Sequence, residues 1–502
     1  MGDWMNYFNR GMNYLKKNGV KDTFYASVER ISDRDKYSFR PISFETMKKQ
    51  MGRNWKKDRL FSLVVPAYET EEKYLRELID AVISQTYVNW ELLIVDSSES
   101  EAVSRVVDAY KDKRIRYIKL KENKGISANT NTGIAKASGE YIGLIDHDDF
   151  ITPNALFEFA IALEKADDEG KKYAFIYSDE DKCDSMGVKF FEPNIKPGFN
   201  LDLLLTNNYI CHFLMVEAGL LKNLKLRPEY DGAQDHDLLL RLYHTTFNSN
   251  DGTEWSYGHI PKVLYHWRSH KNSTSTNTES KSYAYEAGQR AIEDYCEKAK
   301  LHVKVLPLKH CGFFRLEYKD YLNYGNNVNR YNRMVELTDS IRGKIAYRLM
   351  LNRFDIGVIG GPVIKKNKVV GGMLDETKTC PFDGLNINFS GYLHRAVLQQ
   401  DAYGVDVRNM FVNAENFNTV YKNATDEQFA HLFNREAVES MNDTIKADKL
   451  DSPYVDVSAL LSENYYGDFD YINVSTAICA DSRMEGYTVY YDPEFLFFKR
   501  LN

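Results

Sequence analysis

Residues 141–149, Tyr-Ile-Gly-Leu-Ile-Asp-His-Asp-Asp, place three carboxylates directly after the pattern of a buried strand. Open parallel sheets bind their ligands at the carboxyl ends of the strands. Clustered carboxylates repel one another and lose hydration, so a divalent cation such as Mg²⁺ or Mn²⁺, shared with substrate phosphates, is expected to neutralise them. The alternative interpretation is a solvated turn or a helix cap that uses Asp149 before Thr152 and Pro153.

Short β-branched runs alternate with helical patterns around this stretch. The expected strands are residues 60–65, 91–95, 115–118, 141–145 and 173–177. Apolar residues at helical spacing in 75–83 and 103–110 predict helices between the first three strands. Such alternation indicates a parallel sheet with helices on its faces. No Gly-x-Gly-x-x-Gly follows the first strand, which disfavours a dinucleotide-dependent dehydrogenase.

Two further acidic positions fall at the ends of expected elements. Asp96 ends the second strand, where a carboxylate can accept from the imide N–H of a pyrimidine base or from ribose hydroxyls. Asp235 and Asp237 open an expected helix. They are either carboxylates that interact with the helix dipole, or one of them is a general base that deprotonates a hydroxyl nucleophile.

Residues 264–270, Leu-Tyr-His-Trp-Arg-Ser-His, place side chains of several useful chemistries after a strand-like run. A neutral imidazole such as that of His266 can complete a metal site begun by carboxylates. The guanidinium of Arg268 can pair with pyrophosphate, and the indole of Trp267 can stack on a sugar face. The grouping favours a functional site over isolated core residues.

Composition narrows the class of protein. The chain has 502 residues, 43% hydrophobic and 27% charged, which is typical of a folded protein with two or three units. A net charge of -7 without a long basic run argues against nucleic acid as a partner. The six cysteines form no C-x-x-C pair and indicate neither a disulfide framework nor a thiolate zinc site.

The N-terminus and the hydropathy pattern bear on location. No apolar stretch reaches the roughly 18–20 residues of a membrane span, and the order of a signal peptide is missing, so a cytoplasmic location is expected. Trp4, Phe8, Met12 and Leu15 recur at helical spacing with basic residues nearby. This first helix either docks on the protein's own core or rests on the inner face of the cell membrane as a peripheral contact.

Several further motifs follow one another in order between residues 35 and 300. They are residues 61–68, 84–87, 90–96 and 125–131, followed by 176–182, 208–212 and 259–268. With Asp146-His147-Asp148 in the place of a D-x-D motif, they resemble the family 2 glycosyltransferases, which are inverting GT-A enzymes that use nucleotide-activated sugars. Within that family the chain looks like bacterial enzymes that build cell-surface polysaccharides, rhamnosyltransferases among them.

The resemblance implies a GT-A fold, an α/β Rossmann-like and mostly parallel sheet flanked by helices, and it implies roles for single residues. Nucleotide-sugar contacts are expected from Pro66, Tyr68, Glu69, Asp96, Asn131, Asp146, His147 and Arg268. A Mn²⁺ or Mg²⁺ ion is expected on Asp148 and His266, and the base is expected to be Asp235. Contacts to acceptor or sugar are assigned to Asp181, His212 and Trp267.

Four segments are expected along the chain. They are a helical N-terminal extension (1–58), the transferase domain (59–305), a linker (306–340) and a smaller α/β or α+β domain (341–502). The last segment resembles the latter half of a second transferase unit in tandem relatives, through residues 356–361 and 390–395. The nucleotide-binding half of that unit is missing. One active site is therefore expected, with a remnant domain for acceptor binding or self-association into a homo-oligomer.

The expected reaction moves a sugar from a UDP- or dTDP-sugar to a hydroxyl of a growing cell-surface polysaccharide or lipid-linked glycan. Asp235 would deprotonate the acceptor, and direct displacement would invert the anomeric carbon. One rival is a catalytically inactive glycan-binding or scaffold protein, because a fold alone does not establish a reaction. A second rival is a nucleotidyltransferase or phosphohydrolase, which would release free sugar-1-phosphate.

Overall fold

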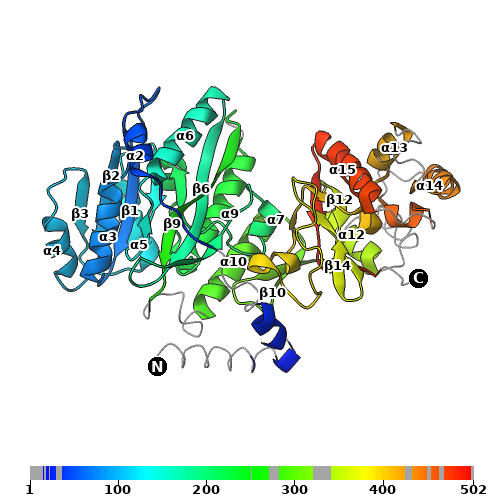
Figure 1. The fold of residues 1–502 in the computed structure, drawn as a ribbon, viewed down its shortest axis with the longest axis horizontal. Coiled ribbons are helices and arrows are strands. Elements are labelled where there is room, and N and C mark those ends of the chain that lie inside the picture. The colour runs from blue at the N-terminus through cyan, green and yellow to red at the C-terminus, as the bar shows by residue number, and fades with distance from the viewer. Residues whose placement is uncertain are drawn as a thin grey trace. The chain divides into compact units, whose positions relative to one another are not determined.

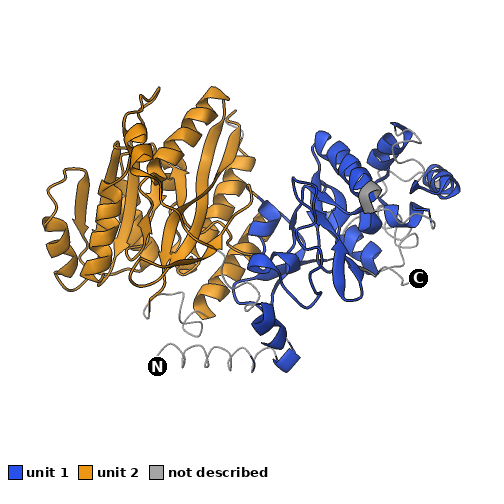
Figure 2. Ribbon diagram, viewed as in Figure 1, with its two compact units in different colours: residues 1–34, 200–206, 300–502 blue, residues 35–199, 207–299 orange. Residues whose placement is uncertain are grey.

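The computed structural model describes residues 15, 19–21, 23–29, 37–249, 252–270, 282–319, 341–423, 432–448, 454–462 and 468–498 (Figure 1). The chain divides into two compact units (Figure 2). The large-sheet unit comprises residues 35–199 and 207–299, and the C-terminal unit comprises residues 1–34, 200–206 and 300–502. The large-sheet unit thus begins at residue 35, where the sequence predicted 59, and ends at 299, where it predicted 305.

The large-sheet unit is built on a nine-stranded sheet with the order β3-β2-β1-β4-β8-β6-β9-β5, and β7 pairs with β6. Its strands are β1 (Phe61–Ala67), β2 (Trp90–Asp96), β3 (Ile115–Lys119), β4 (Tyr141–Leu144), β5 (Phe150–Ile151), β6 (Lys172–Cys183), β7 (Phe190–Asn194), β8 (Leu214–Glu217) and β9 (Trp255–Arg268). Strands β1 to β4 pair in parallel, as do β6 and β9, whereas β8 runs antiparallel between β4 and β6. The predicted α/β class with a mostly parallel sheet is confirmed.

Helices cover both faces of this sheet. They are α2 (Phe44–Met51), α3 (Glu72–Ile83), α4 (Ala102–Asp108), α5 (Ile126–Lys136), α6 (Ala155–Asp168), α8 (Ala218–Leu224), α9 (Gln234–Phe247) and α10 (Ser282–Lys298). Leu75 and Leu78 of α3 join the core cluster that contains Leu63 of β1. Helix α5 packs so closely on the other face that a Cβ at Gly133 would lie 2.5 Å from a methyl group of Val64. Burial on both faces explains why β1 and β2 are continuous apolar runs.

The C-terminal unit has a five-stranded sheet of order β16-β20-β12-β18-β19, a three-stranded sheet β14-β13-β21 and two strand pairs, β10-β11 and β15-β17. Its strands are β10 (Val303–Pro307), β11 (Phe314–Tyr318), β12 (Ile356–Gly360), β13 (Val363–Lys365), β14 (Lys368–Gly371), β15 (Met373–Leu374), β16 (Gln400–Asp401), β17 (Gly404–Val405), β18 (Met410–Asn413), β19 (Tyr454–Asp456), β20 (Thr488–Tyr491) and β21 (Phe497–Phe498). Its helices are α7 (Leu201–Leu204), α12 (Ile341–Asn352), α13 (Ala414–Asn423), α14 (Arg435–Asp448) and α15 (Asp468–Met484). The β10-β11 pair occupies part of the predicted linker.

The five-stranded sheet repeats one part of the large sheet. Strand β12 pairs antiparallel with β18 and parallel with β20, as β6 does with β8 and β9. The matching positions are Phe175 with Val216 and Tyr257, and Val358 with Val412 and Val489. Both central strands carry a register shift just before this position. The origin of this sheet in a second transferase unit stays a prediction, and the repeated register is the observation that supports it.

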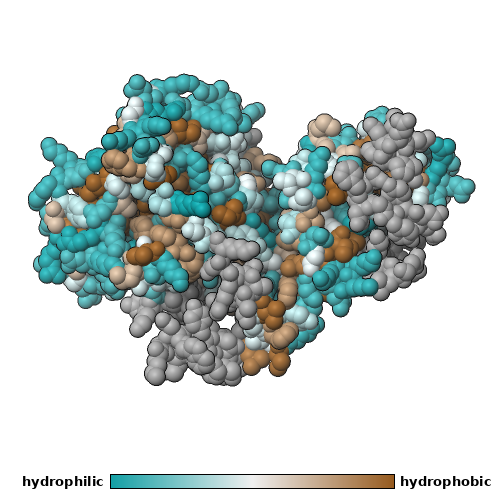
Figure 3. Space-filling model, in the orientation of Figure 1, coloured by the Kyte–Doolittle hydropathy of each residue, from teal (hydrophilic) through white to brown (hydrophobic). Residues whose placement is uncertain are grey.

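The surface hydropathy and the length of the helices are relevant to the predicted contact with a membrane. On the face in Figure 3, hydrophilic residues dominate the large-sheet unit and hydrophobic ones form small separate areas, which is normal for a folded protein. None of the helices in the described part of the chain is long and apolar enough to cross a membrane. Of the predicted N-terminal helix, Trp4, Phe8 and Met12 lie outside the described residues.

A buried group of charges links α7 to the rest of the C-terminal unit. The Arg353 guanidinium donates to the two carboxylate oxygens of Asp202 at 2.5 and 3.1 Å. Burial and the neighbouring Asp202 carboxylate raise the pKa of Asp401 well above its usual value. Burial acts on Asp202 in the same direction, but Arg353 and a hydrogen bond from Asp401 hold the pKa of Asp202 below its usual value. Asp401 is therefore the neutral carboxyl of the pair.

We expect the stability of the variant Asp401→Asn, relative to that of the wild type, to increase as the pH rises. Above the ordinary Asp pKa of about 3.9, the unfolded chain releases this proton whereas the folded chain keeps it, so the wild type loses stability until the pH reaches the raised pKa. The amide is neutral throughout and can still donate to Asp202. In thermal unfolding between pH 4 and pH 8, the Tm advantage of the variant should grow with pH. A pH-independent difference would contradict this account.

Candidate active site

The acidic turn after β4 is fixed by contacts with β9. Asp149 is fully buried, and its carboxylate accepts hydrogen bonds from the Tyr265 hydroxyl at 2.6 Å and the Arg268 backbone N–H at 2.7 Å. Burial and the neighbouring carboxylates of Asp148 and Asp146 raise the pKa of Asp149 well above its usual value. The three predicted carboxylates therefore share one turn at the carboxyl end of a central strand, as the sequence indicated.

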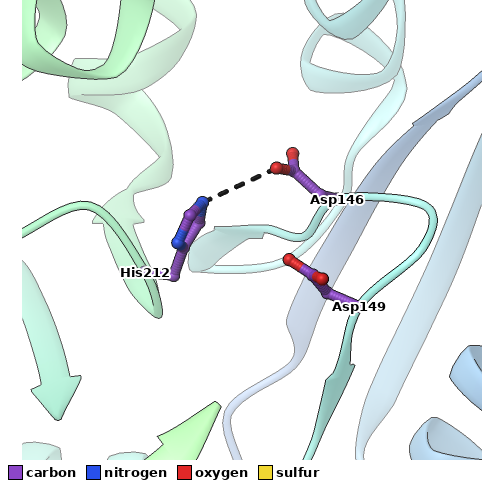
Figure 4. A group of neighbouring side chains, drawn as sticks. All are labelled: Asp146, Asp149 and His212. Atoms are coloured by element: carbon purple, nitrogen blue, oxygen red, sulfur yellow. Dashed lines mark ion pairs between the residues drawn. The ribbon is translucent and has the colours of Figure 1, made fainter. Parts of the chain in front are cut away.

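Asp146, Asp149 and His212 form a three-residue acidic cluster at this turn (Figure 4). One ligand atom from each lies within 4.8 Å of the others, and His212 Nε2 is 3.6 Å from Asp146 Oδ2. No other group of three such residues is found in the described ranges. Two carboxylate oxygens and an imidazole nitrogen are donors that Mn²⁺ or Mg²⁺ accepts, so the chemistry of this set fits a divalent cation.

His212 is held between two carboxylates. Its Nδ1 lies 3.0 Å from Glu180 Oε2, and its ring stacks on Tyr265 with centroids 4.8 Å apart. Burial would lower the pKa of His212, but interactions with Cys211, Asp146 and Glu180 outweigh it and raise the pKa well above its usual value. The Glu180 and Asp146 carboxylates thus fix the position of the imidazole from two sides.

Asp235 lies in the first turn of α9, where the helix dipole favours a carboxylate. Asn208 Nδ2 donates to its Oδ2 at 2.7 Å, and Cys211 Sγ lies 3.6 Å from the same oxygen. Cys211 Sγ is also 3.6 Å from His212 Nε2, so a continuous chain of contacts connects Asp235 to the acidic cluster. Asp237 differs: it is buried, and its carboxylate pairs with Arg227 and Arg241.

Asp96 ends β2 as predicted, and its carboxylate is held by donors from the protein. It accepts from the Tyr117 hydroxyl at 2.6 Å, from Lys119 Nζ at 3.0 Å and from the Ser98 N–H at 2.8 Å. Burial would raise the pKa of Asp96, but these hydrogen bonds outweigh it and lower the pKa. Contact of Asp96 with a nucleotide base stays a prediction, and the lowered pKa means that Asp96 would make this contact as a carboxylate.

Glu69 follows β1 and fixes the loop after β2. Its carboxylate accepts from the Ser100 hydroxyl at 2.6 Å and from the N–H groups of Ser100 and Glu99 at 3.0 and 2.8 Å. The hydrogen bonds from Ser100 lower the pKa of Glu69. Nearby, Pro66 lies in the β1 ladder opposite Val95, and the residue Tyr68 is 48% exposed. Tyr68 is thus accessible to a ligand at this edge.

Two other predicted nucleotide contacts have partners within the protein. His147 Nδ1 lies 3.0 Å from the Thr70 hydroxyl, which ties the acidic turn to the end of β1. The Asn131 amide donates to the Leu226 carbonyl at 2.8 Å and accepts from the Leu226 N–H at 2.9 Å. Asn131 therefore joins α5 to the segment after α8, and its contact with a nucleotide stays a prediction.

His266 is buried on β9 and is oriented by a carboxylate. Its Nδ1 lies 2.5 Å from Asp181 Oδ1, and the Tyr37 hydroxyl donates to Asp181 Oδ2 at 2.6 Å. Its ring packs against three aromatic side chains, Phe39, Phe150 and Phe190. A carboxylate on one ring nitrogen is the usual support of a metal-binding histidine. Both Asp181 oxygens are used here, so contact of Asp181 with acceptor or sugar stays a prediction.

The other predicted metal ligand and its neighbours lie beside the acidic turn. Asp148 Oδ2 is 2.7 Å from His270 Nε2. The buried Arg268 donates from Nε to the Asp148 carbonyl at 2.7 Å and pairs with Glu77 at 2.6 Å, so it shapes the turn from within. The Trp267 ring lies 5.6 Å from the His212 ring.

The structure groups His212, and not His266, with the acidic pair. Tyr265 and His266 are successive residues of β9, so their side chains point to opposite faces of the sheet. Tyr265 contacts Asp149 and His212, which places His266 on the other face. Sequence reasoning gave no role to Glu180, Asn208 or Cys211, although the segment 208–212 carried part of the resemblance.

Residues 62–224 match the family model described as Glycosyl transferase family 2. This stretch is a family 2 glycosyltransferase domain. The matched part runs from β1 to the end of α8 and contains the acidic turn and His212. Asp235 and His266 lie beyond it.

Named relatives of the family 2 domain belong to polysaccharide systems. The O-antigen biosynthesis protein RfbC of Myxococcus xanthus is 34% identical over 240 residues, which are 47% of this chain and 18% of that protein. The putative colanic acid biosynthesis glycosyl transferase WcaA of Escherichia coli is 28% identical over 296 residues, 58% of this chain and 100% of WcaA. The chain thus spans less than a fifth of the O-antigen relative.

A solved structure similar to the chain is Staphylococcus aureus TarS 1–349 in complex with UDP. The likeness has a TM-score of 0.36 and 20% sequence identity, and it covers 47% of this chain and 64% of the TarS chain.

Proposed function

We propose that this protein transfers a sugar from a UDP- or dTDP-sugar to a hydroxyl of a growing cell-surface polysaccharide or lipid-linked glycan, with inversion at the anomeric carbon. The observation that carries the proposal is the chain of contacts from Asp235 through Cys211 and His212 to the acidic turn. These contacts support a single site in which the proposed base lies near the proposed cation site for the diphosphate. The family 2 domain supports transfer of a sugar, and the names of the relatives support a polysaccharide product.

Asp235 takes the proton of the acceptor hydroxyl as that oxygen attacks the anomeric carbon from the face opposite the leaving nucleoside diphosphate. The bond from Asn208 holds Oδ2, so we assign Oδ1 to the acceptor hydroxyl. Asp235 lies in the first turn of α9, at the carboxylate position that a base for a hydroxyl nucleophile requires. Asp237 is excluded from this role because two arginines already neutralise its buried carboxylate.

The acidic turn is the proposed binding site of Mn²⁺ or Mg²⁺. Asp148 is the proposed ligand from the sequence, and Asp146, Asp149 and His212 are the donors that the structure gathers beside it. When bound, the cation supplies Lewis-acid stabilisation of the leaving diphosphate. Arg268 holds the turn in place through the Asp148 carbonyl, so its role is positioning.

Substitutions can distinguish between His212 and His266 as ligands of the cation. We expect His212→Ala to weaken Mn²⁺ binding by about 10- to 100-fold, because its imidazole lies in the acidic cluster. His266→Ala is the matched control, since that ring is also paired with a β6 carboxylate but lies on the other face. Calorimetric titration of Mn²⁺ into both folded variants checks this. A larger loss in His266→Ala would instead support the ligand predicted from the sequence.

Product analysis tests the reaction itself. The protein is incubated with UDP- or dTDP-sugars and Mn²⁺, and the nucleotide product is identified. Release of nucleoside diphosphate, by transfer or by slow hydrolysis, is expected. Free sugar-1-phosphate would indicate a nucleotidyltransferase or phosphohydrolase, and an unchanged donor would indicate a scaffold protein. Peripheral contact with the inner membrane face, where a lipid-linked acceptor would lie, is part of the proposal.

A further inference from the structure

The chain crosses between its two units just before the loop that supports Asp235. It leaves the large-sheet unit after Phe199, contributes residues 200–206 to the C-terminal unit, and returns at Asn207. The next residues, 207–212, include the donor to Asp235 and the histidine of the acidic cluster. The loop therefore starts from a point that belongs to the C-terminal unit.

Residues 200–206 are fastened to the C-terminal unit at three places. The Asn200 amide donates to the Asp401 carbonyl at 2.9 Å and accepts from the Asp401 N–H at 3.1 Å. The Thr206 carbonyl accepts from the Phe314 N–H at 2.8 Å. Between these two anchors lies Asp202 with its ion pair. Both ends and the middle of the seven-residue segment are thus held by groups from distant parts of the sequence.

The Asp202–Arg353 ion pair carries a desolvation cost that is not needed merely to attach the segment. Leu203 and Leu204 of α7 are buried and already hold the segment by apolar packing. The side chains of Asp202 and Arg353 are only 2% and 8% exposed, and taking two charges out of water offsets most of their attraction. A two-pronged bond between guanidinium and carboxylate, however, fixes distance and direction as apolar contacts do not. The pair is thus suited to setting the position of the segment.

We propose that Asp202 and Arg353 are a positioning pair for catalysis, and that the C-terminal unit serves as the anchor of the loop 207–212. With the pair intact, Asn208 stays within hydrogen-bond distance of Asp235. When the pair loosens, the segment shifts and the base loses its orientation. The inference rests on the proposed function insofar as Asp235 is the base, and it gives the C-terminal unit a task that requires no second active site.

The variant Arg353→Lys tests the pair while keeping the buried positive charge. Lysine cannot form both bonds to Asp202, so we expect kcat for sugar transfer to fall by about 10- to 100-fold, the cost of a displacement near 1 Å. The donor KM and the Kd for UDP with Mn²⁺ should rise by a smaller factor than kcat falls, because Asp146 and Asp149 lie outside the loop and His212, the member of the cluster on the loop, is retained. The matched control is Arg408→Lys, whose guanidinium pairs with the buried Asp406 and donates to Val370 in the same unit. It should lose similar thermal stability and keep its kcat.

Hydrogen exchange of the full chain gives a readout that does not depend on turnover. In Arg353→Lys, amides of residues 207–212 should exchange at least about tenfold faster, with those of 141–149 unchanged; Arg408→Lys should leave both segments unchanged. If no sugar nucleotide is turned over by the wild type, the proposed function fails, yet this comparison still decides the positioning role. Equal exchange of 207–212 in wild type and Arg353→Lys, or an equal loss of kcat in both lysine variants, would overturn the inference.

Discussion

Asp235→Asn is expected to lower kcat for sugar transfer by about 10²- to 10⁴-fold, the usual contribution of a positioned general base. The amide keeps the shape of the side chain and can still interact with Asn208, but it cannot accept a proton. Binding of UDP with Mn²⁺ should be unchanged, because Asp235 reaches the acidic turn only through Cys211 and His212. Initial rates at saturating donor and acceptor, with calorimetry on the same samples, check both parts.

The control for this experiment is Asp237, which lies two residues after Asp235 in α9. Asp237→Asn removes a carboxylate of the same helix turn, but this one is buried between Arg227 and Arg241. We expect a lower Tm, because Arg227 and Arg241 lose a charged partner that is buried between them, and a kcat per folded molecule within about threefold of the wild type. If the two variants lost kcat equally, Asp235 would be a structural residue and the assignment of the base would be wrong.

The second large effect is expected at the acidic turn. Asp148→Ala should reduce transfer by at least about 10²-fold, because a cation that stabilises the leaving diphosphate contributes several kcal/mol. Excess Mn²⁺ should restore only part of the rate. Rates measured across a Mn²⁺ series, with chelator as the zero point, separate weakened metal binding from loss of folding.

A surface carboxylate provides the matched comparison. Asp168 is an acidic residue of the same unit with a 55% exposed side chain that pairs with Lys56. Asp168→Ala should leave the rate and its Mn²⁺ dependence unchanged, since exposed ion pairs contribute little. Full activity of Asp148→Ala in the presence of chelator would show that the reaction does not use this turn.

The core of the fold was predictable because the signals are local. Continuous apolar runs such as 61–67 and 90–96 mark strands buried on both faces, and the helical spacing in 75–83 marks the helix between them. The segment 200–206 was not predictable in the same way. Its Leu-Asp-Leu-Leu pattern fits either unit, and the arginine that holds Asp202 lies 151 residues away in sequence.

At the candidate site, too, local sequence patterns indicate single residues but not the contacts between residues that are distant in sequence. Asp146 and Asp235 could be singled out as candidates because each stands at the end of an element, where ligands bind, and their roles stay predictions. The pairing of His212 with Glu180 depends on β8 lying between β4 and β6, an order that no local pattern contains. For Asn131 the residue type could be singled out, but whether the protein itself satisfies its amide appears only in the folded structure.

The central claim is a cation-dependent nucleotide site at the acidic turn. Isothermal titration of UDP and dTDP, with and without Mn²⁺, into the wild type and Asp148→Ala tests it most directly. We predict that the wild type binds one of the two nucleotides only with Mn²⁺ and that Asp148→Ala loses this binding. If neither nucleotide bound with a Kd below about 1 mM in the presence of Mn²⁺, a free energy of about −4 kcal/mol, or if both proteins bound equally, the claim would be contradicted.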